Sequence, residues 1–294
     1  MSTKKTEIDL TKIKNASAIN KVEPGFEERM VKAGTQNKVS RFNFTPSELI
    51  PLPSGGRLYA KPEITTDPDI LKGFVRMKPM TIKEEEILST SRFAKTGSTT
   101  RMIMSRCIES EIDAKDILLY DSNFLMFYLR KISYGDEYGF ELTCGNGNCE
   151  KKFEHKILIS ELKFDTLPED FVEPIEVKLP VSKYTVLCIL PRLYHSEETY
   201  MKNMNRKKKA DEEDRRLTDN ILVTTLEILD AEGKKLPRSD WEEFMGALPG
   251  RDRAELTKRT SVATGVDKLE GIECPYCGVD YNGTVPVGAE FFRF

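Results

Sequence analysis

Two cysteine pairs decide the fold of this chain: CGNGNC at residues 144–149 and CPYCG at residues 274–278. Each pair is flanked by segments in which apolar and polar residues alternate, the pattern of a half-buried strand. The flanking strands are expected at residues 137–143, 152–159, 268–273 and 281–287. We therefore expect two β-hairpins, each with two cysteines at its tip.

Thiolates from two facing hairpin tips match the donor set of a structural zinc site, in which four ligands surround Zn²⁺ at about 2.3 Å. The expected ligands are Cys144, Cys149, Cys274 and Cys277. Pro275 and Gly278 favour a tight knuckle turn that points backbone amides at the sulfurs, whereas the first pair is more widely spaced. Four free thiols, and disulfides or redox-active thiols, are the alternatives.

The two pairs are separated by 124 residues. Closing a loop of that length costs about 4 kcal/mol of chain entropy, less than the roughly 10–16 kcal/mol that a structural Zn²⁺ contributes. A metal would therefore attach the intervening helical insertion to the hairpins. Catalytic zinc is not expected, because four thiolates leave no open coordination position and no Glu accompanies a His-Cys set, as deaminases require.

No other constellation indicates catalysis. Cys107 and Cys188 lie within an expected helix and an expected strand, and we expect both to be buried like small apolar residues. His155 and His195 are the only histidines, and neither accompanies a Ser or Cys in a nucleophile setting. The carboxylates at 84–86 and 242–243 are typical of exposed helix surface. We therefore expect a protein that is not an enzyme.

Composition excludes several classes of protein. The 294 residues include 45 Lys and Arg against 48 Asp and Glu, for a net charge of −3, which argues against a general binder of polyanions. No stretch approaches the roughly 18 uncharged apolar residues of a membrane span, and residues 1–10 have no apolar signal region. A cytosolic location is expected, where thiols stay reduced and the six cysteines call for another explanation than disulfides.

The first 45 residues form a separate, basic region, with nine Lys and Arg against five Asp and Glu. Their apolar residues follow neither a helical nor a strand period, so residues 1–45 are expected to be an extended arm. Such an arm is either a disordered tail or a segment that orders along a partner. Phe26, Phe42 and Phe44 favour the second alternative.

The remaining chain is expected to be α+β: zinc-ribbon-like β-hairpins with a helical insertion, preceded by the arm. Residues 46–135 are expected to form a strand-plus-helix region, and 136–294 the hairpins (136–160 and 268–290) around a β-hairpin and helices. Asp121 is expected to cap a helix over 122–132, and Thr81 to begin another with a capping box. A tight turn is also expected at 55–56, and strands are expected at 74–80, 176–179 and 184–190. Further helices are expected over 99–108 and over the apolar stripe 217–229, and others beginning at 195, 240 and 250.

Several motifs, taken in order, resemble those of T4-type bacteriophage baseplate hub and hub-assembly proteins. They are LPSGGRLY at 52–59, TIKEEE at 81–86, LRKISYG at 129–135, LPGRD at 248–252, and CPYC at 274–277 with FF at 291–292. The resemblance covers roughly 50–294 and implies a non-enzymatic part or assembly factor of a contractile phage tail. The arm and the charged stretch 204–216 look like extensions of the family pattern.

Two functions follow as hypotheses. The first is a structural or assembly component of a baseplate hub that binds other tail proteins, present in the host cytoplasm during assembly or in the virion tail. Candidate partner contacts are Phe26, Phe42, Phe44, Phe291, Phe292 and Phe294. The C-terminal aromatics could instead complete the protein's own core. The alternative function is a zinc-ribbon regulator that binds nucleic acid, which predicts a basic face, whereas the chain after the arm is acidic.

Overall fold

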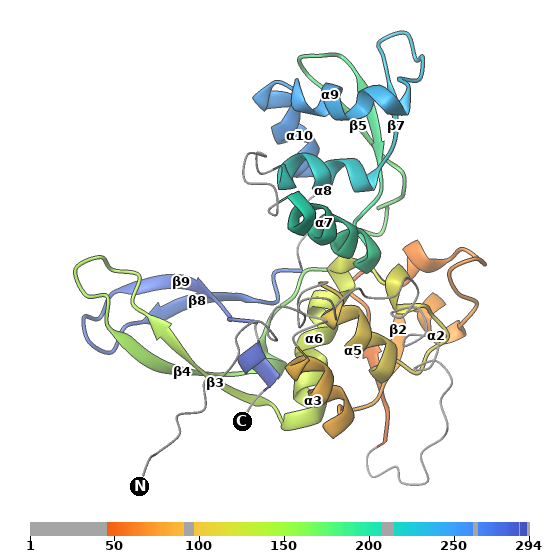
Figure 1. The fold of residues 1–294 in the computed structure, drawn as a ribbon. Helices are drawn as coiled ribbons and strands as arrows, with labels where there is room; N and C mark the ends of the chain where they lie inside the picture. The colour runs from red at the N-terminus through yellow and green to blue at the C-terminus, as the bar shows by residue number, and fades with distance from the viewer. Residues whose placement is uncertain (1–45, 91–96, 207–214, 261–263, 288, 293–294) are drawn as a thin grey trace, which may run out of the picture. The chain divides into compact units, whose positions relative to one another are not determined.

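The computed structural model describes residues 46–90, 97–206, 215–260, 264–287 and 289–292 (Figure 1). All of them belong to Phe42–Phe294, one of the two units into which the chain divides. The predicted arm, with Phe26, Phe42 and Phe44, lies outside these residues, as does Phe294. Within the described part, no helix is long and apolar enough to cross a membrane.

Small antiparallel sheets and helices make up the described chain, which confirms the α+β class. The sheets pair β1 with β2, β3 with β4, β6 with both β5 and β7, and β8 with β9. The strands are β1 Glu48–Pro51, β2 Phe74–Met77, β3 Glu137–Thr143, β4 Lys152–Leu158, β5 Ile175–Lys178, β6 Thr185–Cys188, β7 Thr225–Leu229, β8 Lys268–Glu273 and β9 Asp280–Thr284.

Two of these sheets are the predicted cysteine hairpins, β3–β4 and β8–β9, which run close to each other in Figure 1. In β3 the residues alternate between exposed and buried, with Tyr138 and Phe140 turned inward. A bulge interrupts the β8–β9 ladder between Leu269 and Ile272. The predicted strands are therefore present: β4 ends one residue earlier than expected, and β9 begins one residue earlier and ends three residues earlier.

The helices are α2 Pro68–Leu71, α3 Ile82–Ser89, α5 Thr99–Cys107, α6 Leu119–Tyr134, α7 Leu193–Arg206, α8 Arg216–Thr224, α9 Trp241–Gly246 and α10 Gly250–Thr260. The capping box predicted at Thr81 is present, because Thr81 and Glu84 satisfy each other's backbone at the start of α3. Helix α6 ends at Gly135 with φ +96°, a conformation that glycine adopts without steric cost. Cys107 and Cys188 are fully buried, as predicted.

Asp121 is not the predicted helix cap. Helix α6 begins at Leu119, three residues before the predicted start at 122, so Asp121 lies within its first turn. The fully buried Asp121 carboxylate instead accepts hydrogen bonds from the Ser54 amide at 2.9 Å, the Ser54 hydroxyl at 2.6 Å and the Tyr59 hydroxyl at 2.7 Å. The prediction was wrong because the partners of this side chain lie more than 60 residues away in the sequence.

The Ser54–Tyr59 segment that Asp121 holds contains the predicted glycine turn. Gly55 and Gly56 have φ of +66° and +77°. A Cβ atom on Gly56 would lie 1.9 Å from the carbonyl oxygen of Ile70. Glycine is therefore required at Gly56 both by the left-handed backbone and by the close approach of another chain segment.

The residues 217–229, predicted to form one helix, belong to two elements, a helix and a strand. Helix α8 ends at Thr224, and the next residues form β7, which pairs with β6. Pairing with a distant strand overrides the local helical period here, and it buries Ile228 completely. Residues 207–214, which make up most of the charged stretch 204–216, lie outside the described part of the chain.

Candidate metal centre

The four predicted cysteines converge at the tips of the two hairpins. Their sulfurs all lie within 4.8 Å of one another, and in the described residues they are the only group of three or more side chains suited to hold a metal ion. The closest contacts cross between hairpins: the Sγ atoms of Cys144 and Cys277 are 3.7 Å apart, and those of Cys149 and Cys274 are 4.0 Å apart.

Backbone hydrogen bonds shape each tip. In the first hairpin the Cys144 amide donates to the Lys151 carbonyl at 2.9 Å, and the Cys149 amide donates to the Asn146 carbonyl at 2.8 Å. These bonds fold the longer loop back, so its wider spacing still presents both sulfurs to one point. In the second hairpin the Gly278 amide donates to the Cys274 carbonyl at 2.9 Å, and Gly278 has φ +67°.

The distances between the sulfurs fit tetrahedral thiolate coordination. Four ligands about 2.3 Å from a zinc ion at tetrahedral angles lie about 3.8 Å from one another. Two of the distances between the sulfurs, 3.7 and 4.0 Å, bracket that value, and all of them are within 4.8 Å. All six cysteines of the described chain are free thiols, so the arrangement is one of four separate donors rather than two disulfides.

The electrostatics of the cluster also favour a cation. Burial raises the pKa of the Cys274 thiol, but hydrogen bonds from the Tyr276 and Cys277 amides outweigh it, and the pKa falls to about 7. For Cys144, the Asn146 amide lowers the pKa, but burial and the three neighbouring thiols raise it, to about 12. Adjacent thiolates repel each other, so four can ionise together only when a positive ion lies among them.

Contacts away from the cysteines also join the hairpins. The Tyr281 hydroxyl donates to the Thr143 carbonyl at 3.4 Å, and the Tyr138 hydroxyl donates to the Pro286 carbonyl at 3.2 Å. A Cβ atom on Gly145 would lie 3.2 Å from the Tyr281 ring. Sequence patterns identified the cysteines but not Tyr281. The only sign of its role in the sequence is an aromatic residue shortly after the second cysteine pair.

Cys144 and Cys274 are buried, Cys149 is half-buried and Cys277 is exposed. The centre therefore lies at the surface on the Cys277 side. A metal ion could enter there without unfolding of the hairpins. The Asn146 side-chain amide, 3.8 Å from the Cys277 sulfur, stands at that exposed side.

The C-terminal aromatics Phe291 and Phe292 are buried in the protein's own core. Phe291 is fully buried, with its ring centroid 5.0 Å from that of Phe127 and 4.9 Å from that of Tyr138. Phe292 packs against Phe291 and lies near Tyr134. Of the two alternatives for Phe291 and Phe292, the structure fits the one in which they complete the protein's own core, because buried rings offer no surface to a partner.

The remaining candidates do not gather into a site. Glu84 is buried because it caps the start of α3, which corrects the expectation that residues 84–86 are all exposed. Glu242 forms an ion pair with Arg215 at 2.6 Å. His155 packs against Phe140, and the buried His195 accepts a hydrogen bond from the Arg192 amide. None of these groups joins the cysteines.

The family model described as "T4 bacteriophage base plate protein" matches residues 61–293. The chain matches no curated protein and no solved structure. The match spans α2 to η6 (Ala289–Phe292) and includes both cysteine hairpins. Because it covers most of the sequence, the chain belongs to the T4 bacteriophage base plate protein family.

Proposed function

We propose that this chain is a non-enzymatic part or assembly factor of a baseplate hub, in which a structural Zn²⁺ joins the two cysteine hairpins. Membership of the family makes it a structural component of a phage baseplate that assembles with other tail proteins. The observation that carries the proposal is the convergence of four thiols from two pairs 124 residues apart in the sequence.

Zinc suits the donor set better than Mg²⁺ or Ca²⁺. Four sulfur ligands in a tetrahedron select Zn²⁺ or iron, whereas Mg²⁺ and Ca²⁺ prefer oxygen ligands. Bound there, Zn²⁺ supplies a cross-link and no reaction, because Cys144, Cys149, Cys274 and Cys277 fill all four positions. The hairpins alone are small two-stranded sheets, which are marginally stable without such support.

The metal would hold the long insertion between the hairpins at both of its ends. That insertion carries helices α7 to α10 and strands β5 to β7. It exposes the apolar side chains of Leu217 in α8 and Leu226 in β7, which are 63% and 47% exposed. We propose that these helices and the basic arm, with Phe26, Phe42 and Phe44, contact other hub proteins. Phe294 is proposed as a further contact.

The alternative function, a nucleic-acid-binding zinc ribbon, has weaker support. The two hairpins and their flanks, residues 136–161 and 268–284, carry nine acidic and four basic side chains. A ribbon that binds nucleic acid needs the opposite balance, because phosphate contacts supply most of the affinity. Binding of duplex DNA at 0.15 M salt with micromolar or tighter affinity would favour this alternative.

Complementation tests the proposed role. The gene is deleted from the phage genome that carries it, and wild type, Cys277→Ser or Cys188→Ala is supplied in trans. We expect wild type and Cys188→Ala, which lacks a thiol outside the cluster, to restore complete baseplates in electron micrographs. Cys277→Ser is expected to leave tails without complete hubs. Complete baseplates in the deletion strain with no complementing protein would contradict the role.

A further inference from the structure

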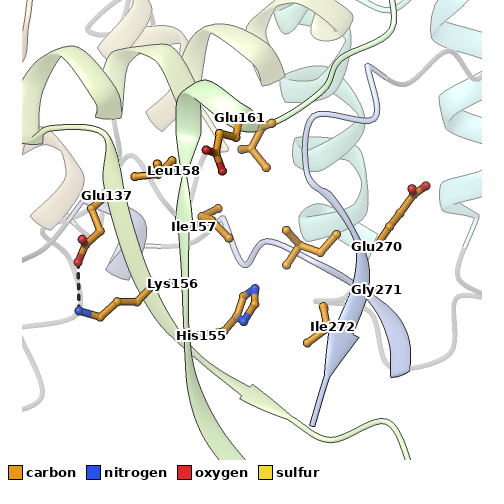
Figure 2. A pocket seen from close by; sticks show the side chains of 11 residues that line it. Glu137, His155, Lys156, Ile157, Leu158, Glu161, Glu270, Gly271 and Ile272 are labelled. Atoms are coloured by element: carbon orange, nitrogen blue, oxygen red, sulfur yellow. Dashed lines mark hydrogen bonds and ion pairs between the residues drawn. The ribbon is translucent and has the colours of Figure 1, made fainter. Parts of the chain in front are cut away.

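A pocket of about 450 Å³ lies between the cysteine hairpins, lined by the end of β4, the residues after it, and the bulged part of β8 (Figure 2). This volume is in the range of ligand-binding sites in proteins. Its lining includes Ile157 and Ile272 as apolar surface, and Glu161 and Glu270 as acidic groups. None of the four cysteines lines it, so it is distinct from the metal centre.

The pocket faces the edges of strands rather than a face of a sheet. Four consecutive residues of each strand line it, 155–158 in β4 and 269–272 in β8. Successive side chains of a strand point to opposite faces, and Figure 2 shows His155 and Ile157 on the side of β4 toward β8, with Lys156 on the other side. A cavity that meets both sets must lie along the strand edge.

Both of these edges lack a strand partner in the part of the chain that is described. Strand β4 pairs with β3, and β8 pairs with β9, and each sheet has two strands. The bulge between Leu269 and Ile272 also interrupts pairing of β8 with β9. Unpaired edges present rows of backbone donors and acceptors that an extended peptide can use.

The charge of the pocket indicates what kind of peptide it would take. Its one lysine, Lys156, is already bound to Glu137 at 3.1 Å. Glu161 and Glu270 are exposed, and neither forms an ion pair with any described residue. Figure 2 shows Glu161 on the side of β4 toward β8, whereas the Glu270 side chain extends away from β4 on the far side of β8. The pocket therefore offers one unneutralised carboxylate, that of Glu161, beside apolar surface, which complements a basic side chain with an aliphatic stem.

We propose that this pocket binds an extended, basic segment of another tail protein, which adds as a strand along the edge of β4. A four-residue edge spans about 13 Å, so the segment pairs over about four residues. Its Lys or Arg stem lies over Ile157 and Ile272, and its charge faces Glu161. The proposal rests on the proposed function, because a baseplate component has tail proteins as its partners.

Selection from a display library of random twelve-residue peptides tests this on the purified, metal-loaded full chain. The test variant is Glu161→Lys. The matched control is Glu154→Lys, which reverses one exposed carboxylate of β4 outside the pocket. Zinc content and melting temperature are measured for both, so that a folding defect is recognised.

We expect wild type and control to enrich peptides with Lys or Arg next to apolar residues, and the test variant to lose at least tenfold in affinity for them. A switch of the test variant to acidic peptides would be further support. No enrichment, enrichment without basic residues, or equal losses in test and control would overturn the proposal. Because no tail particle takes part, these results stand apart from the complementation that tests the hub role.

Discussion

The hydroxyl of Tyr59 donates a hydrogen bond to the Asp121 carboxylate at 2.7 Å and accepts one from the Leu118 amide at 2.9 Å. The same carboxylate also binds the backbone and the hydroxyl of Ser54. This group fastens the glycine turn to the start of α6. The Asp121 carboxylate is buried completely, so each of these donors depends on it for an acceptor.

Asp121→Ala should therefore destabilise the protein by at least about 3 kcal/mol, because it leaves three buried donors without an acceptor. Urea unfolding measures the loss. The control is Asp170→Ala, which removes an exposed carboxylate and should change stability by less than about 0.5 kcal/mol. Equal effects of the two substitutions would contradict the role given to Asp121.

Gly56→Ala should cost on the order of 3 kcal/mol or more, since φ is +77° and the new Cβ would collide with the Ile70 carbonyl. Gly246→Ala is the matched control: this residue ends α9, and no atom lies within 4 Å of its Cβ position. It should be neutral or stabilise by up to about 1 kcal/mol. Melting temperatures of the two variants, compared with wild type, check both expectations.

Phe291→Ala should destabilise the isolated protein by about 3–5 kcal/mol, because it removes a fully buried ring that packs on Phe127 and Tyr138. Phe74→Ala, at a position 39% exposed, should cost about 1 kcal/mol or less. If Phe291 served only a partner, its removal would leave the unfolding free energy of the isolated chain unchanged.

Acid should weaken the fold through His195. Its Nδ1 atom accepts a hydrogen bond from the Arg192 amide at 3.0 Å, so the buried ring is neutral. Burial, with a smaller effect of the Arg192 charge, lowers the pKa from 6.5 to about 4. Between these values the unfolded chain binds a proton that the folded chain does not, so stability falls as the pH falls from 6.5 toward 4.

The loss attributable to His195 is about 2 kcal/mol at pH 5 relative to pH 7. Urea unfolding of wild type and His195→Asn at the two pH values isolates it, because both proteins share every other titrating group, the cysteines included. The wild type should lose about 2 kcal/mol more than the variant. The same loss in both would show that His195 is not the group responsible.

Local patterns predicted the parts of this structure that depend on neighbouring residues. The alternation of residues in β3 and β4, the capping box at Thr81 and the turn glycines all act within a few positions of the chain. The cysteine pairs could be assigned to one site because tetrahedral thiolate chemistry needs four donors, and the sequence offers one plausible set outside the core.

The misses depend on residues far apart in the sequence. Asp121 accepts a hydrogen bond from Ser54, 67 positions away, whereas a capping rule considers only the next turn of the helix. Strand β7 interrupts an apolar helical period because β6 offers it a backbone ladder. The pocket between the hairpins arises from two strand edges that a one-dimensional pattern cannot bring together.

The central claim, that one metal ion joins the two hairpins, is tested most directly by metal analysis of the purified chain together with Cys277→Ser and Cys188→Ala. We expect about one zinc per chain in wild type and Cys188→Ala, four thiols protected from alkylation until a chelator is added, and loss of most zinc in Cys277→Ser. Zinc well below one per chain in wild type, with all four cluster thiols alkylated in the native state, would contradict it.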